Sequence, residues 1–211
     1  WKIYLPVLIA ALMCSLPGII IGEKRQRLKE VLLVSIGALA LSQLLLIAGH
    51  SWILFITAFF ILFTAFNLLE AILPSMVSKI APAGSKGTAT GVYSTCQFLG
   101  IFVGGALGGK VYASFDATGL LSLNVAALIA WWLIARTMAN PKKVSTYLLQ
   151  VGQLSSTAIE KIQQDLLTIS GVVEAAIMPD DGVAYLKVDK RKLDETRLLA
   201  VAQKDTTSKS A

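Results

Sequence analysis

Long apolar stretches, separated by short polar segments, fill most of the chain up to residue 139. An α-helix of about 20 apolar residues is long enough to cross a hydrocarbon core of roughly 30 Å. Five stretches meet that length, namely Ile3–Gly22, Val31–Gly49, Trp52–Ser78, Thr88–Gly109 and Ala117–Ala135. Their connections are short, so neighbouring spans are expected to run antiparallel. The pattern predicts an α-helical membrane bundle.

The remainder of the chain alternates between short strand-like and helix-like segments. In order, we predict a strand at Ser145–Val151, a helix at Ser155–Ser170, strands at Val172–Met178 and Val183–Val188, and a helix at Leu193–Lys204. A Ser/Thr cap begins the first helix, Gly171 ends it, and the turn residues Pro179–Gly182 join the last two strands into a hairpin. The order βαββα is the split βαβ unit of a ferredoxin-like fold, short of its last strand.

The two parts are predicted to be separate domains in different solvents. We expect membrane helices over 1–139, a linker over 140–144, a small α+β ferredoxin-like domain over 145–204 and a disordered tail over 205–211. Of the 211 residues, 55% are hydrophobic and 15% are charged, which places the chain in the membrane class. Up to Lys143 there are 11 Lys/Arg against 4 Asp/Glu, whereas from Val144 onward there are 8 against 9. The net charge of +6 therefore belongs to the membrane part and gives no argument for a nucleic-acid partner.

The basic residues also predict an orientation. Nine lie in the segments after the first, third and fifth spans and two lie on the other side, so the basic segments are expected in the cytoplasm. The segment Glu23–Glu30 is the most basic, with Lys24, Arg25, Arg27 and Lys29. It is a candidate topology determinant, anionic-lipid patch or gating latch. Because the chain opens at Trp1 directly into an apolar run, we expect upstream spans to be missing.

Glu70 is a lone carboxylate inside the third predicted span. A charge near a helix centre costs roughly 2.5–3.5 kcal/mol on insertion scales, so such residues usually face a cavity or a partner. Asn67 lies one turn before it, and Pro74 removes the N–H that would bond the Glu70 carbonyl. Two interpretations stay open: a proton- or substrate-binding carboxylate, or a structural partner for a group in the missing half.

The fourth predicted span carries polar and small residues at helical spacing. Tyr93 and Gln97 offer hydrogen bonds that lipid cannot satisfy, so we expect them to face protein or a cavity. Gly100, Gly104 and Gly108 form a seam suited to close helix packing.

Little in the sequence favours a metal, a cofactor or an enzyme. Cys14 and Cys96 lie in apolar runs, and His50 is a single histidine in a short turn. The predicted tail domain contains neither cysteine nor histidine, which argues against soft-metal binding. No phosphate loop, nucleophile elbow or zincin motif occurs.

The arrangement resembles a known family. The spans, with the basic loop Gly22–Glu30 between the first two, resemble helices eight to twelve of a major facilitator superfamily transporter. The run from Phe63 to Gly109 is similar to the tenth and eleventh helices of bacterial proton-coupled efflux carriers. The fused βαββα tail resembles the YAM domain, a ferredoxin-like module, of YajR-type members.

This resemblance implies a twelve-helix, two-bundle transporter of the bacterial inner membrane, working by alternating access and proton antiport, with a cytoplasmic regulatory or accessory domain. It implies lipids, a small-molecule substrate and the missing N-terminal bundle as partners. The loop Gly22–Glu30 would be the second copy of the family's motif A, although it lacks the Gly-x-x-x-Asp-Arg-x-Gly pattern. The seam Gly100–Gly108 would pack against the first bundle.

A different class of function is also compatible with the residues. The membrane part could serve as a non-transporting scaffold, whose tail domain senses a ligand or self-associates.

Overall fold

A computed structural model describes residues 2–25, 27–49, 51–139, 145–150, 156–178, 182–189 and 193. The chain divides into two compact units. The first comprises Trp1–Val77 and Gly91–Pro141, and we call it the membrane unit; the second comprises Ser78–Thr90 and Lys142–Ala211, and we call it the tail unit. The tail unit thus includes a segment that lies between two predicted membrane spans.

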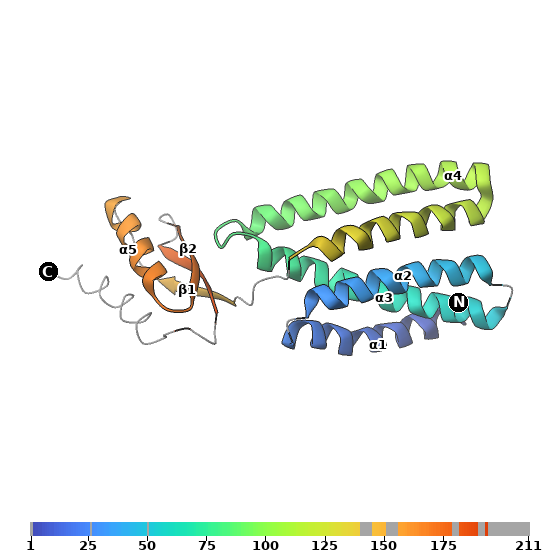
Figure 1. The fold of residues 1–211 in the computed structure, drawn as a ribbon, viewed down its shortest axis with the longest axis horizontal. Helices are drawn as coiled ribbons and strands as arrows, with labels where there is room; N and C mark the ends of the chain where they lie inside the picture. Colours follow the sequence, from blue (N-terminus) through green and yellow to red (C-terminus); the bar gives the residue numbers. More distant parts are fainter. Residues whose placement is uncertain are drawn as a thin grey trace. The chain divides into compact units, whose positions relative to one another are not determined.

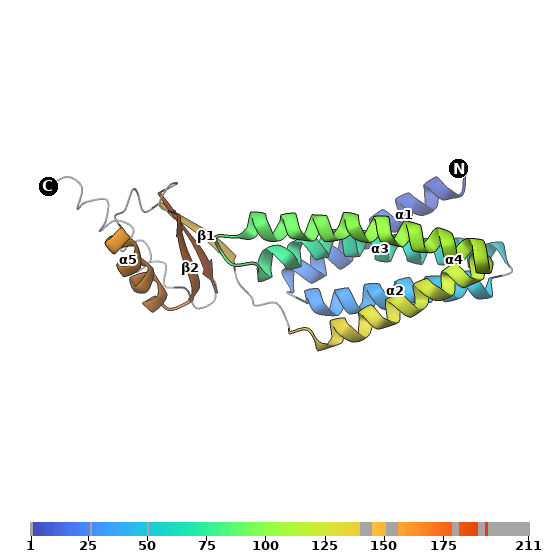
Figure 2. The ribbon, with the colours of Figure 1, turned by 90° about the horizontal axis from the view of Figure 1, so that it is seen from above.

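The membrane unit is helical, as its apolar pattern predicts (Figure 1). Its helices are α1 (Tyr4–Lys24), α2 (Leu28–Ala48), α3 (Trp52–Ile80) and α4 (Lys86–Thr137). Within the described residues, these four helices are long and apolar enough to cross a membrane. The first three correspond to the first three predicted spans. Figure 2 shows α2, α3 and α4 running along one another for much of their length.

Helix α4 corrects the expected boundary between the fourth and fifth spans. The predicted connection at 110–116 is helical, and only Asp116 leaves helical geometry, with φ 55° and ψ −164°. This combination lies outside the left-handed helical region and in one that is almost confined to glycine. The chain reverses direction there, so α4 consists of two limbs (Figure 1). A Cβ on Gly119 would collide with the Cβ of Phe115, so this tight reversal requires glycine.

The core of the membrane unit lies where α2 and α3 meet the end of α4. Its buried residues are Leu28, Leu32 and Ile36 from α2, Leu69, Ile72 and Met76 from α3, and Ala135 from α4. Other faces of these helices remain exposed. Phe98, Ile101 and Phe102 on the first limb of α4 are 70%, 64% and 74% exposed. Apolar side chains of this size at the surface fit a lipid or protein environment rather than water.

The tail unit contains a three-stranded antiparallel sheet in the order β1-β3-β2. Its elements are β1 (Ser145–Gln150), α5 (Ser156–Thr168), β2 (Val172–Met178) and β3 (Val183–Val188). The central strand β3 lies between two strands that are joined by α5, which is the split βαβ arrangement. Helix α5 ends at Thr168, two residues before the predicted end at Ser170, and Gly171 has φ 91° in the turn that leads into β2.

The core of the tail unit lies between α5 and one face of the sheet. It consists of Leu149, Ile162, Leu166, Ile169, Ala175, Ala184, Leu186 and Val188. From the predicted helix Leu193–Lys204, only Leu193 is described, and it packs against this core. The predicted linker 140–144, the disordered tail 205–211 and His50 lie outside the described residues, as do three residues of the Pro179–Gly182 turn.

Candidate functional site

The structure places Glu70 of α3 against Gln97 of α4. The Gln97 Nε2 donates a hydrogen bond to the Glu70 Oε1 at 3.1 Å. Tyr93 lies one turn before Gln97 on the same helix. Two of the four residues predicted to line a pathway therefore meet where α3 faces the first limb of α4.

Asn67 and Pro74 lie on either side of this contact along α3. Asn67 is half-buried, and among the described residues it makes no hydrogen bond to Glu70. Helix α3 continues through Pro74 to Ile80. Proline has no N–H, so the Glu70 carbonyl receives no hydrogen bond from that position. The predicted polar stripe is present in sequence order, but the carboxylate of Glu70 bonds to Gln97 of α4 rather than to Asn67.

The chemistry of this contact is that of a carboxylate held by a neutral donor. Within the described part of the chain, no lysine or arginine lies within ion-pair distance of Glu70. An amide hydrogen bond satisfies one oxygen and leaves further acceptor positions on the carboxylate. Such a group can take up a proton or bind a donor-bearing ligand. In the same residues, no group of three or more His, Cys, Asp or Glu side chains could hold a metal ion.

The predicted glycine seam is open over most of its length. A Cβ added at Gly100 or Gly104 would meet nothing within 4 Å, whereas one at Gly108 would lie 3.3 Å from Leu120 Cδ1. Gly108 therefore supports the approach of the two α4 limbs. Close packing at Gly100 and Gly104 stays a prediction about a partner outside the described residues.

A cavity of about 740 Å³ lies between α2, α3 and both limbs of α4. Its polar lining includes Gln43 and Asn124, and Gly100 contributes to its wall. Gln43 is buried, with 8% of its surface exposed. Sequence reasoning missed both amides, although a lone Gln or Asn in an uncharged span carries the same kind of signal as Gln97.

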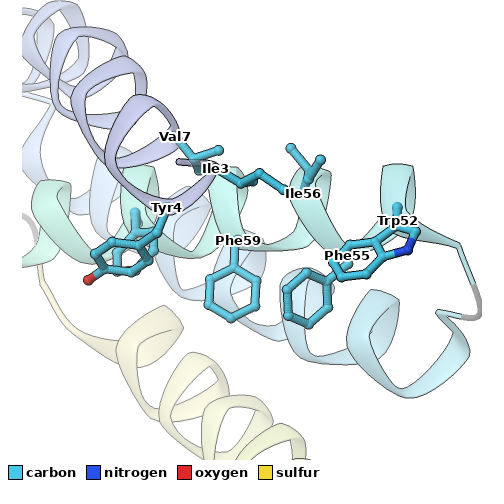
Figure 3. A pocket seen from close by; sticks show the side chains of 8 residues that line it. Ile3, Tyr4, Val7, Trp52, Phe55, Ile56 and Phe59 are labelled. Carbon is cyan, nitrogen blue, oxygen red and sulfur yellow. The ribbon is translucent and has the colours of Figure 1, made fainter. Parts of the chain in front are cut away.

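A smaller apolar cavity of about 200 Å³ lies between the first turns of α1 and α3. Figure 3 shows Trp52, Phe55 and Phe59 following one another along α3, beside Tyr4 and Val7 of α1 and the preceding residue Ile3. The Phe55 and Phe59 ring centroids are 4.6 Å apart. Aromatic residues are enriched where a membrane helix meets the interface. This cavity contains no ionisable group comparable to Glu70.

The basic loop is tied to the bundle by one of its four predicted residues. The Lys29 Nζ donates hydrogen bonds to the carbonyl of Arg136 at 2.8 Å and to that of Met138, at the end of α4. Arg27 forms an exposed ion pair with Glu30 at 3.2 Å. Lys24 and Arg25 are exposed. Lys29 therefore neutralises a helix C-terminus, where a cation is favourable.

Comparison with known proteins settles the family. The Major Facilitator Superfamily model matches residues 4–177. The chain belongs to this superfamily. Two relatives of this superfamily member carry names that describe them as transporters.

Curated relatives of this superfamily member are longer than the chain. It is 36% identical over 193 residues to the inner membrane transport protein YajR of Escherichia coli, covering 90% of the chain and 42% of YajR. It is also 36% identical over 88 residues to an uncharacterized transporter of Buchnera aphidicola, covering 42% of the chain and 22% of that protein. The chain thus spans less than half the length of these relatives.

Proposed function

We propose that this chain is the C-terminal part of a proton-coupled efflux transporter of the bacterial inner membrane. Its membrane unit supplies one bundle, and an N-terminal bundle completes the pathway by alternating access. The substrate is a small molecule, and lipids surround the apolar helix faces. The basic loops and the tail unit lie in the cytoplasm, where the tail unit acts as a regulatory or accessory domain and self-associates.

The observation that carries this proposal is the contact between Glu70 and Gln97 on two different helices. A carboxylate in a membrane helix is costly and is retained mainly for function. Here it has a neutral hydrogen-bond donor instead of a cation among the described residues. A proton or a substrate can therefore compete for it without first displacing a salt bridge. Superfamily membership and similarity to YajR support the idea that this carboxylate serves transport.

The test is Glu70→Gln in the full-length protein. A panel of lipophilic cationic and neutral dyes is first screened for one whose efflux depends on the wild-type protein. Transport is then measured with that dye. We expect the variant to insert and express normally, because glutamine keeps the shape and a hydrogen-bonding end. Its efflux should lose most of its dependence on the pH gradient, because glutamine cannot exchange a proton.

Glu30→Gln provides the matched control. Glu30 is a carboxylate in an exposed ion pair at the basic loop, so its replacement should leave efflux unchanged. Efflux by Glu70→Gln that keeps the wild-type pH dependence would contradict the proposed role of Glu70.

A further inference from the structure

The face of the tail sheet that points away from α5 carries a charged pair whose lysine is buried. Glu174 of β2 lies directly opposite Lys187 of β3 in the antiparallel register. Their side chains form an ion pair, with 3.4 Å between Lys187 Nζ and Glu174 Oε2. The Lys187 side chain is 7% exposed and that of Glu174 is 38% exposed. A lysine this deeply buried is uncommon unless its ammonium group is fully satisfied.

A bulge in β2 places Glu174 on this face. The register passes from Val172 opposite Val188 to Glu174 opposite Lys187, so Val173 is an extra residue. Strand side chains alternate between faces, and without the extra residue Glu174 would share a face with Val172, which packs on the α5 core. The bulge therefore turns the carboxylate away from the apolar core and toward the lysine.

The ammonium group of Lys187 is satisfied by the end of α3. It donates to the carbonyls of Lys79 at 3.2 Å and Ile80 at 3.4 Å, and also to that of Ala81. The last carbonyls of a helix have no partner within the helix, and a cation near them is favourable. Lys187 thus acts as the C-terminal cap of a helix that lies more than a hundred residues earlier in the sequence.

The segment after α3 lies on the same face of the sheet. The Ala83 N–H donates to Glu174 Oε1 at 3.1 Å, and Ala81 and Ala83 are 5% and 3% exposed. A Cβ added at Gly84 would lie 2.8 Å from Met178 Cε and 3.3 Å from Ala176 Cβ. The connection between α3 and α4 is therefore packed as part of the tail unit.

We propose that this face of the sheet is a docking surface for the α3–α4 connection, and that docking restrains the end of α3 and so slows transport. Lys187 and Glu174 are its positioning residues: one caps the helix, and the other holds both the lysine and the Ala83 amide. Glu70 precedes Ile80 by ten residues on the same helix, α3. Holding the helix end therefore constrains the carboxylate. The transport part of this inference rests on the proposed function.

The docking is tested by cross-linking in the full-length protein, in membranes. Cys14 and Cys96 are replaced by serine, Gly84→Cys and Ala176→Cys are introduced, and a protease site is placed within 140–144. A disulfide joins Cβ atoms about 3.5–4.5 Å apart, close to the separation at this pair. We expect rapid oxidation, so that the protease releases the tail only after reduction. Gly87→Cys with Ala176→Cys is the control, because a Cβ at Gly87 meets nothing within 4 Å.

Lys187→Met in the cross-linking background tests the cap itself. We expect cross-linking to slow roughly tenfold, the scale of losing hydrogen bonds from a charged donor. Lys161→Met, at an exposed position on α5, should leave the rate unchanged. If the Gly84 pair reacts no faster than the Gly87 control, the docking is wrong. If Lys187→Met does not slow the reaction, the capping role is wrong.

The same protein separates the docking from the proposed function. Dye efflux is compared before and after oxidation and again after reduction. A cross-linked tail should lower the efflux rate, and reduction should restore it. Equal rates would overturn the claim that the tail constrains α3. Dye efflux is also compared between membranes that contain the reduced protein and membranes that lack it. If the two rates are equal, the proposed function fails while the cross-linking result still stands.

Discussion

Glu70 and Glu174 both accept a hydrogen bond from a distant part of the chain, but their surroundings differ. Glu174 receives the Ala83 amide and an ion pair from Lys187, a lysine that also caps a helix. Glu70 is exposed in the membrane unit and receives the neutral amide of Gln97. Glu174 is fixed by its ion pair with a buried lysine, whereas Glu70 keeps acceptor positions free.

This difference separates a structural carboxylate from a functional candidate. Removing one member of a buried pair leaves the other member without compensation, so its loss should appear as lost stability. Removing a member of an exposed, neutral contact should change stability little, so its loss should appear in activity. Each carboxylate can therefore be assigned by which of these two quantities changes.

The largest effect on stability is expected from Glu174→Lys. The substitution sets two lysines directly opposite each other and removes the acceptor of the Ala83 N–H. We expect the tail unit to lose about 2–3 kcal/mol, reduced from the value for a fully buried pair because Glu174 is partly exposed. Hydrogen exchange of the amides in β2 and β3 of the full-length protein measures it. Protection equal to the wild type would remove the distinction between the two carboxylates.

A smaller loss is expected from Lys187→Met. Methionine keeps much of the aliphatic volume but leaves the α3 carbonyls and Glu174 without the ammonium group. Because Glu174 can still reach water, we expect about 1–2 kcal/mol. The same exchange measurement applies, with the exposed Lys161→Met as control, expected to change stability by less than about 0.5 kcal/mol. Similar losses in both variants would show that the burial of Lys187 has no energetic role.

Gln97→Leu should show the opposite balance. Stability should fall by less than about 1 kcal/mol, since the exposed Glu70 can find another donor. Dye efflux should fall about tenfold, the kinetic equivalent of one lost hydrogen bond to a charged group. Thr95→Val on the same helix is the control, because among the described residues its hydroxyl bonds to nothing but the Gly91 carbonyl one turn away. Unchanged efflux in Gln97→Leu would remove the amide from the site.

The smallest effect is expected from Arg27→Ala. Arg27 and Glu30 form an ion pair whose side chains are 58% and 64% exposed, so it is an ion pair without burial. Its loss should change thermal unfolding in detergent by less than about 0.5 kcal/mol. If Arg27→Ala lost as much unfolding free energy as Lys187→Met, charge pairing rather than burial would account for the stabilisation by Lys187.

The helices and strands were predictable because each burial pattern is local. Apolar runs gave the spans, and period-two alternation gave the strands of the tail sheet. The break at Asp116 was misplaced because glycines and Lys110 suggested an earlier end to the span. In a membrane, backbone groups must be hydrogen-bonded, so the helix continues through such residues until the chain reverses.

The candidate site was predictable only in part. Glu70 stands out as a charge in an apolar run, and Gln97 follows from helical spacing, but their pairing depends on how two helices are rotated against each other. Lys187 gives no signal in its sequence. Its burial arises because a segment from another part of the chain covers that face of the sheet, and the bulge at Val173 has no marker in the residues themselves.

The reversal in α4 also bears on how the protein enters its membrane. Since only Asp116 leaves helical geometry, the two limbs are joined by a single residue rather than by a polar loop. We therefore expect the pair to insert as a single hairpin, with Lys110 and Asp116 carried across at its tip, so that biogenesis commits both limbs in one step.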